Sequence, residues 1–528
     1  MAHLSISVVA FPMNRPFLLT LCLGLSLFLA GDLSAADKLP EPVQKVLERP
    51  EYRHAHWGIL FVDVATGETV YELNADKLFG PASVTKVFST ASAWDYLGEG
   101  HQFKTYVRRR GEIENDGLLK GDLILVASGD PTMGGRTDDK GHIAFKDVDH
   151  IYSNWTPANE LTPQDPLAGL KELARQIAKS GIKAVSGDVV VDDRLFDKAE
   201  GSGSGPSLLT PIVVNDNLVD FVITPTKAGE KAKVVWRPQS VGIQVDAQVE
   251  TVAEGKPVIA VRSEGAGRYS LRGVIPATNA PLVRIAEVAD PAAYARMLFV
   301  EALQAAGVTV MASPLATNNL SALPSSEAVA KLAPMATLVS PPFRENARLV
   351  LKVSHNQHAG MLPLLVAVQH GQRTVNEGLQ WQKKFLVRAG VEADSISFGG
   401  AAGGSRADLV TPKATVQLLR YMSTRPDFAG FEAALPVLGR DGTLAAISKN
   451  HAAAGKVRAK TGTYVVDNAL NQTGLLTSKA LAGYMTTAKG RKLAFAVFVN
   501  MTHLREGEKS SREGEALGRI CEIVFEMN

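Results

Sequence analysis

Ser83 and Lys86 stand three residues apart in the segment Phe79–Leu97, FGPASVTKVFSTASAWDYL, and have the residue types for nucleophilic catalysis. On a helix, residues i and i+3 share a face, so the serine hydroxyl and the lysine amine can meet. A lysine acts as a base near neutral pH only when burial or a nearby cation lowers its pKa, and a serine needs such a base to attack. Pro81 suits a first helical turn, which predicts a helix over 82–97 with the serine at its start.

The Ser-x-x-Lys pattern alone does not decide the assignment, because Ser180 and Lys183 form a second match. That match follows a predicted helix over 165–180, so it falls on a helix-to-strand connector without a preorganised face for a nucleophile. A helix start also adds a positive field where an oxyanion forms. The sequence therefore favours Ser83 as the nucleophile and Lys86 as its base.

Two further motifs follow in chain order: Ser354–Asn356 (SHN) heads a helical run, and Lys460–Thr463 (KTGT) ends a predicted strand over 455–463. The hydroxyl and amide of the first can move a leaving-group proton and hold a substrate amide. The second sets a cation and a hydroxyl beside a substrate carboxylate, and its glycine admits an extended ligand. The backbone N–H groups of Ser83 and Thr463 are expected to form an oxyanion hole. The expected site comprises the catalytic residues Ser83, Lys86, Ser354, Asn356 and Lys460 and the substrate-binding residues Thr461, Gly462 and Thr463.

The elements that must position these residues mix strands and helices. Strands over 58–63 and 69–73 are joined by a turn, so a hairpin precedes the Ser83 helix. Alternating runs make the segment 217–272 mostly β. Apolar spacing predicts helices over 165–180, 291–306, 375–388, 411–422 and 513–526.

Length and composition bound the class of protein. The chain has 528 residues, 45% of them hydrophobic and 21% charged, which predicts a folded protein of two or three domains. A net charge of only +2 argues against a dedicated nucleic-acid surface. His355 and His358 lack an evident third ligand in the sequence, so we expect no metal, and the chemistry above needs no cofactor.

The first 36 residues read as a secretory signal. Arg15 supplies the charge, the run Phe17–Ala30 is apolar, and small residues near Ala36 make a cleavage site. Cleavage leaves Cys521 as the single cysteine, so no intramolecular disulfide is expected. We expect a protein exported to a bacterial periplasm or cell exterior, with no transmembrane anchor after cleavage.

Partial matches to the second and third motifs occur at Ser448–Asn450 and Lys179–Gly181, but the full set in this order is much rarer. This trio is found in active-site serine β-lactamases and penicillin-binding proteins. The chain resembles the peptidase S13 family of serine D-alanyl-D-alanine carboxypeptidases and endopeptidases, the class C low-molecular-mass penicillin-binding proteins. The segments that carry the resemblance, besides the three motifs, are Phe79–Lys86, Gly121–Met133, Gly187–Phe196, Gly439–Leu444 and Gly455–Thr463.

The resemblance implies an α/β fold: a β-lactamase/transpeptidase-like domain, with an antiparallel sheet flanked by helices, and two smaller inserted domains. By position, the catalytic domain covers 37–103 and 333–528, an inserted domain II covers 104–200 and 270–332, and a mostly β domain III covers 201–269 nested inside it. It also implies peptidoglycan stem peptides as substrates and β-lactam antibiotics as covalent inhibitors. The balance of carboxypeptidase and endopeptidase activity stays open.

Two stretches depart from the family pattern. His355 stands where the family usually has an acidic residue, and His358-Ala359-Gly360 replaces a following Ala-Glu or Ala-Asp pair. Gly399–Arg406 (GGAAGGSR) stands where Asp-Gly-Ser-Gly-Leu-Ser-Arg is typical. These departures motivate one alternative, a catalytically impaired peptidoglycan-binding or scaffolding protein. A second alternative is a β-lactamase or esterase that uses the same trio.

Overall fold

The computed structural model describes residues 39–156, 160–505, 507 and 510–528. The predicted signal segment, residues 1–36, lies outside the described residues. Within the described ranges, no helix combines the length and apolarity needed to cross a bilayer.

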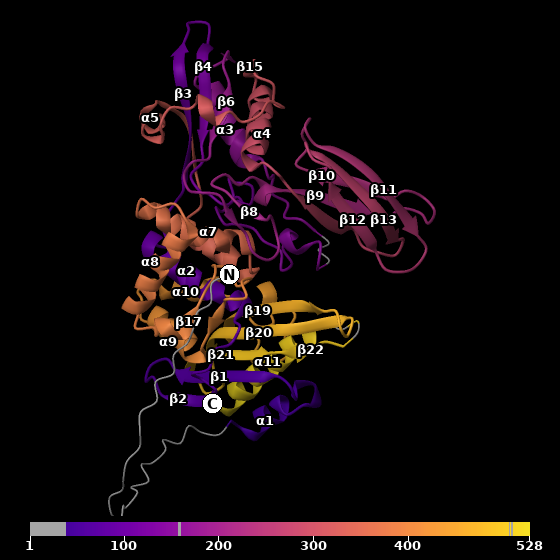
Figure 1. Cartoon of the computed structure of the whole chain (residues 1–528), viewed down its shortest axis with the longest axis vertical. Coiled ribbons are helices and arrows are strands. Elements are labelled where there is room, and N and C mark those ends of the chain that lie inside the picture. Colours follow the sequence, from indigo (N-terminus) through magenta and orange to yellow (C-terminus); the bar gives the residue numbers. More distant parts are fainter. Residues whose placement is uncertain (1–38, 157–159, 506, 508–509) are drawn as a thin grey trace, which may run out of the picture. The chain divides into compact units, whose positions relative to one another are not determined.

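The central sheet joins strands from near the start of the described chain to strands from near its end. Its strand order is β19-β20-β21-β1-β2, and all pairs are antiparallel. The strands are β1 (His56–Asp63), β2 (Thr69–Leu73), β19 (Val457–Asn468), β20 (Thr473–Thr486) and β21 (Lys492–Asn500), with β22 (Thr502–His503) paired to β20. Figure 1 shows the indigo strand β1 beside the yellow strand β21, which meet over their whole lengths.

Helices cover both faces of this sheet because side chains alternate along each strand. In β21, Phe495 and Val497 face a core that includes Ile520, whereas Ala496 and Phe498 face a second core. The first core lies under α1 (Glu41–Leu47) and α11 (Ser511–Met527). The second lies under α2 (Thr85–Leu97), α6 (Phe343–Lys352), α7 (Asn356–Gln369), α8 (Val375–Arg388), α9 (Pro412–Ser423) and α10 (Phe428–Ala434).

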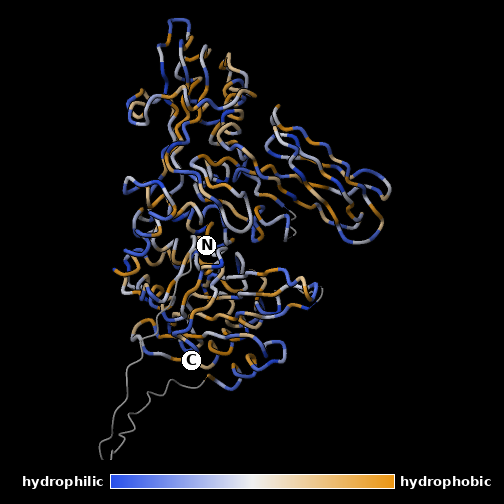
Figure 2. The backbone as a smooth tube through the Cα atoms, in the orientation of Figure 1, coloured by the Kyte–Doolittle hydropathy of each residue, from blue (hydrophilic) through white to orange (hydrophobic). Residues whose placement is uncertain are grey.

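A second sheet has the order β15-β5-β4-β3-β16, with β6 paired to β4. Its strands are β3 (Lys104–Ile113), β4 (Leu118–Val126), β5 (Ala184–Val185), β6 (Val189–Asp192), β15 (Thr309–Val310) and β16 (Pro334–Val339). The helices α3 (Ala168–Lys179) and α4 (Pro291–Ala305) supply apolar side chains to the same core. Figure 2 shows hydrophobic stretches along these strands and a hydrophilic turn between β3 and β4.

Two smaller sheets are formed mainly by the segment that the sequence marks as mostly β. One has the order β10-β9-β14 and the other β11-β13-β12. Their strands are β9 (Leu218–Thr224), β10 (Lys233–Arg237), β11 (Gln244–Val252), β12 (Val258–Ser263), β13 (Arg268–Pro276) and β14 (Leu282–Glu287). The division into inserted domains stays a prediction. In the sheet that contains β3 and β4, strand β16 pairs with β3. The hydrogen bonding of that sheet therefore extends past residue 332, where the predicted domain II ends.

The predicted helices over 165–180, 291–306, 375–388, 411–422 and 513–526 correspond to α3, α4, α8, α9 and α11. Two local predictions were wrong. Ser83 lies in a 3-10 turn (Ala82–Val84) and the α-helix begins at Thr85, because Ala82 has a φ of +45°, outside the helical region. The KTGT motif lies within β19 rather than at its end, because pairing with β20 continues to Asn468.

Candidate active site

Ser83 and Lys86 meet as the sequence predicts, although the geometry is that of a turn leading into a helix. Lys86 Nζ donates to Ser83 Oγ over 2.9 Å. The turn is fixed from the other side by β19, where a Cβ on Gly462 would lie 2.3 Å from the carbonyl oxygen of Pro81. Glycine is therefore required at this point of the strand for the Ser83 turn to pack closely.

Lys86 is fully buried and has two further acceptors: Asn356 Oδ1 at 2.7 Å and the carbonyl oxygen of Ala402 at 2.6 Å. Burial lowers the pKa of Lys86 to about 7, and the charge of Asp408 opposes part of that shift. A neutral amine beside a serine hydroxyl is the arrangement that a general base requires.

Ser354 and Lys460 form the second pair. Lys460 Nζ donates to Ser354 Oγ over 2.9 Å and to the carbonyl oxygen of Thr461 over 2.7 Å. Burial, reinforced by the charge of Lys86, holds the pKa of Lys460 well below its ordinary value. Ser354 has a φ of +63°, which is rare for a residue with a Cβ, and the Tyr152 hydroxyl donates to its carbonyl oxygen. A tyrosine outside the three sequence motifs, Tyr152, therefore stabilises the unusual backbone conformation of Ser354.

The remaining predicted residues line the same region. Thr461 Oγ1 donates to Thr443 Oγ1 over 2.7 Å, so the segment that contains Thr443 orients the KTGT hydroxyl. Thr463 is exposed and follows Gly462 along β19. Asn356, which accepts from Lys86, also lies against Gly203, where a Cβ would stand 2.5 Å from Asn356 Nδ2. The structure therefore links Ser83 to Lys86 and Asn356, and Ser354 to Lys460, while Thr461–Thr463 continue along the strand that packs on the Ser83 turn.

Gly399–Arg406, the stretch that departs from the family pattern, forms a wall beside Lys86. Asp408 accepts backbone N–H groups of Gly399 and Ser405 over 2.9 and 3.0 Å and so holds the loop. The loop carbonyls accept from Lys86 and, at Ala401, from Ser89 Oγ over 2.9 Å. The role of Tyr152 was missed, because no local motif marks it.

Gly403 gives a test of this wall. It has a φ of +82°, and a Cβ there would lie 1.9 Å from the carbonyl oxygen of Ala82, the residue before Ser83. Gly403→Ala is expected to slow covalent labelling by a fluorescent penicillin about 10²-fold, because the Ser83 turn must move. Gly490→Ala is the matched control, since Gly490 has a φ of +83° and a Cβ there would meet nothing within 4 Å.

Gly490→Ala should lower the free energy of unfolding by about 1 kcal/mol through backbone strain alone and leave labelling unchanged. Equal labelling rates in the two variants would show that the loop does not constrain Ser83. Thermal unfolding of both variants checks that each is folded.

The competing Ser-x-x-Lys match lies at the end of a helix. Ser180 caps the end of α3, and its Oγ donates to the carbonyl oxygen of Ile177 over 2.7 Å. Lys183 lies in the connector to β5, as the sequence predicts. The hydroxyl of this second Ser-x-x-Lys pair is therefore bonded to the backbone, whereas the Ser83 hydroxyl is bonded to its lysine.

Comparison with known proteins gives the family. The model of the D-Ala-D-Ala carboxypeptidase 3 (S13) family matches residues 39–518. The chain belongs to this family. It is 30% identical to a D-alanyl-D-alanine carboxypeptidase of Actinomadura sp. (strain R39), over 92% of this chain and 85% of that protein. It is 24% identical to the D-alanyl-D-alanine carboxypeptidase DacB of Haemophilus influenzae, over 84% of this chain and 85% of that protein.

The fold agrees with this membership of the S13 family. The crystal structure of penicillin binding protein 4 from Haemophilus influenzae matches with a TM-score of 0.67 at 22% identity, covering 92% of this chain and 98% of that one. The predicted family and the α/β, transpeptidase-like fold class are therefore confirmed, and the chain is a hydrolase of the serine peptidase class.

Proposed function

We propose that this S13 chain is a serine-type D-Ala-D-Ala carboxypeptidase, DD-endopeptidase or both, which acts on peptidoglycan stem peptides through an acyl-enzyme on Ser83. The observation that carries the proposal is the 2.9 Å contact between Ser83 Oγ and Lys86 Nζ, with the lysine fully buried. The S13 relatives named as D-alanyl-D-alanine carboxypeptidases support the substrate class.

In the first half-reaction Ser83 Oγ attacks the carbonyl carbon of the penultimate D-Ala while Lys86 Nζ takes its proton. The backbone N–H groups of Ser83 and Thr463 stabilise the tetrahedral oxyanion. The amide bond then breaks, leaving an ester on Ser83 and releasing D-Ala, or the amine of a cross-linked partner. Water attacks the ester in the second half-reaction, and the serine hydroxyl is restored.

Ser354 and Lys460 act on the leaving-group side. Their 2.9 Å contact gives the Ser354 hydroxyl a route for passing a proton to the departing nitrogen. Lys460 and Thr461 hold the substrate carboxylate, and Asn356 links the two halves because its Oδ1 accepts from Lys86. A substrate with a free carboxylate beside the scissile amide fits this set of groups.

Two expectations follow from the proposed reaction. A β-lactam presents a strained amide next to a carboxylate, so it should acylate Ser83 and persist; a solved β-lactam complex of the Haemophilus influenzae protein supports this for a relative. We also propose that the enzyme works in the periplasm or outside a bacterial cell, where its wall substrate lies and where the predicted signal over 1–36 would deliver it.

The purified enzyme should be incubated with pentapeptide muropeptides and with cross-linked dimers, and the products identified by mass. Loss of one D-Ala from the pentapeptide indicates carboxypeptidase activity, and conversion of dimer to monomers indicates endopeptidase activity. Retained peptidoglycan binding without products or a penicillin adduct would overturn the proposal in favour of a scaffolding protein. Rapid turnover of penicillin without a persistent adduct would favour the β-lactamase alternative.

The pH dependence of acylation follows from Lys86. Its pKa of about 7 lies below the ordinary lysine value because of burial, so the neutral, basic form predominates above pH 7 and the ammonium below it. The second-order rate of penicillin acylation is expected to fall about tenfold per pH unit below 7 and to level off above it. Stopped labelling reactions between pH 5.5 and 8.5 measure this profile. A rate that keeps rising tenfold per pH unit up to pH 8.5 would mean that Lys86 is not the base.

A further inference from the structure

A buried polar cluster lies directly behind the SHN motif, at His355. Ser354 and Asn356 of this motif lie in the candidate active site, whereas the side chain of His355 points away from it. There it meets His358 of the same helix and Asp216, which is 139 positions away from His355 in the chain. All three side chains are buried, and one ligand atom from each lies within 4.8 Å of the others. The third ligand that the sequence did not reveal is therefore present.

His355 is only partly satisfied by protein groups, because its Nδ1 has one long contact, 3.4 Å from the backbone N–H of His358. Its Nε2 atom is buried and has no hydrogen-bond partner among the described residues. It points at Asp216 Oδ1, 3.6 Å away, and at Asp149 Oδ1, 3.8 Å away. These separations are too long for hydrogen bonds. They are close to the roughly 3.3 Å expected between two ligands that each bind one tetrahedral zinc ion at about 2.0 Å.

His358 faces the same carboxylate oxygen. His358 Nε2 lies 2.8 Å from Asp216 Oδ1, and its Nδ1 lies 3.1 Å from Asn346 Nδ2. Asn346 Oδ1 is buried and has no partner within the described chain. Exchanging the two ends of this amide would let Oδ1 accept a hydrogen bond from the Nδ1–H group of His358, which leaves the lone pair of Nε2 to bind a metal. A histidine ligand that donates its other ring N–H to an oxygen is the usual arrangement at metal sites.

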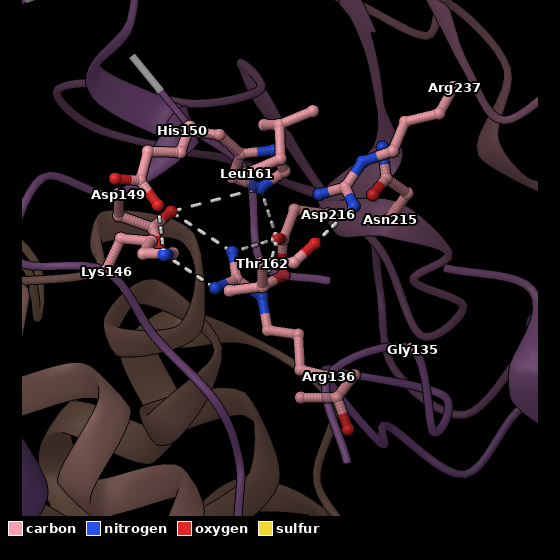
Figure 3. A pocket seen from close by; sticks show the side chains of 12 residues that line it. Gly135, Arg136, Lys146, Asp149, His150, Leu161, Thr162, Asn215, Asp216 and Arg237 are labelled. Carbon is pink, nitrogen blue, oxygen red and sulfur yellow. Dashed lines mark hydrogen bonds and ion pairs between the residues drawn. The ribbon is translucent and has the colours of Figure 1, made fainter. Parts of the chain in front are cut away.

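The surrounding charges leave one oxygen of Asp216 available. Arg136 binds Asp216 Oδ2 and both oxygens of Asp149, and His150 Nε2 also contacts Asp216 Oδ2. Figure 3 shows Arg136 reaching toward both carboxylates from one side.

We propose that Asp216, His355 and His358 bind a zinc ion behind the active site, with water as the fourth ligand. Two imidazoles and a carboxylate are a set of ligands that suits zinc, and their ligand atoms already lie within 4.8 Å of one another. The ion joins the start of α7 to the turn Asn215–Asn217, so it is a structural ion that holds Ser354 and Asn356 in place.

The full chain, treated with EDTA and dialysed, should be titrated with Zn²⁺ and with Co²⁺, whose visible absorption reports coordination. We expect one ion per chain and a Co²⁺ spectrum typical of tetrahedral or five-coordinate nitrogen and oxygen ligands. His355→Gln and His358→Gln are expected to weaken Zn²⁺ binding at least about 100-fold. His503→Gln, which changes an exposed histidine on β22, is the matched control and should bind as the unmodified chain does.

Thermal unfolding gives a second readout that does not depend on activity. Zn²⁺ should raise the Tm of the unmodified chain and of His503→Gln and leave the Tm of His355→Gln unchanged. Three results would each overturn the proposal. They are binding of less than one ion per chain, equal Zn²⁺ affinity in all variants, and a Tm of the unmodified chain that does not change when Zn²⁺ is added. If His355 is an ordinary core histidine, its replacement lowers the Tm equally with and without Zn²⁺, which also overturns it.

Discussion

Ser83→Ala is expected to remove covalent labelling by a fluorescent penicillin and release of D-Ala together. The change deletes the atom that forms the ester, and loss of the nucleophile in a serine hydrolase costs about 10⁶-fold in rate. Ser83 is only partly buried, and its Oγ accepts a single hydrogen bond from Lys86 in the structure. The free energy of unfolding should therefore change by no more than about 1 kcal/mol, which thermal unfolding can check.

Ser180→Ala is the matched control because it alters the other Ser-x-x-Lys pair. Ser180 sits at the end of α3, where its hydroxyl bonds to the backbone, and we expect full labelling in this variant. Mass spectrometry of the labelled, digested protein should find the adduct on the peptide that contains Ser83. An adduct on any other residue, or equal labelling of Ser83→Ala and the unmodified chain, would remove the nucleophile assignment.

Lys86→Gln is expected to reduce acylation by about 10⁴-fold because an amide cannot accept the Ser83 proton. The amide can keep some of the hydrogen bonds that Lys86 makes to Ser83, Asn356 and the Ala402 carbonyl, so the loss should exceed what disturbed packing would cause. The residual rate should also lose the pH dependence near 7 that the unmodified enzyme shows.

Lys479→Gln makes the same substitution at another lysine whose pKa is lowered, in this case a half-buried one. Burial lowers the pKa of Lys479 to about 8, but its Nζ lies near Ser510 and Gly514, at α11, and not at Ser83. The Lys479→Gln variant should keep the acylation rate of the unmodified chain, even if the substitution lowers the free energy of unfolding. If both variants lose acylation equally, the effect belongs to lysines of lowered pKa in general and the base must be sought elsewhere.

The sequence predicted the parts of the site that short spacings encode. Ser83 and Lys86 are neighbours in the chain, so residue type and an i, i+3 separation were sufficient to pair them. The motif segments fall on α7 and β19, and the apolar periodicity of helices such as α8 was strong enough to give their bounds directly. Local patterns also misled: Ala82 lies outside the helix because close packing against β19 fixes its backbone.

Tertiary contacts determined what the sequence could not give. Asp408 and Tyr152 act on the site through a loop and a strained carbonyl, and neither belongs to a motif. The carboxylate that faces the two histidines of α7 comes from Asp216, which follows a different set of strands. Spacing along the chain carries no information about such contacts, because they are determined only by the packing of separate sheets.

The sheet that pairs β1 with β21 also constrains how the enzyme acquires its activity. The Ser83 turn is translated early, yet the strand that packs against it, β19, begins at Val457 and is held in the sheet by β20 and β21. Pairings between such distant segments form slowly. For most of synthesis, Ser83 of the growing chain therefore has no pocket around it. Covalent capture of penicillin should consequently serve as a clock for the last stage of folding, because it begins only when the final strands have joined the first.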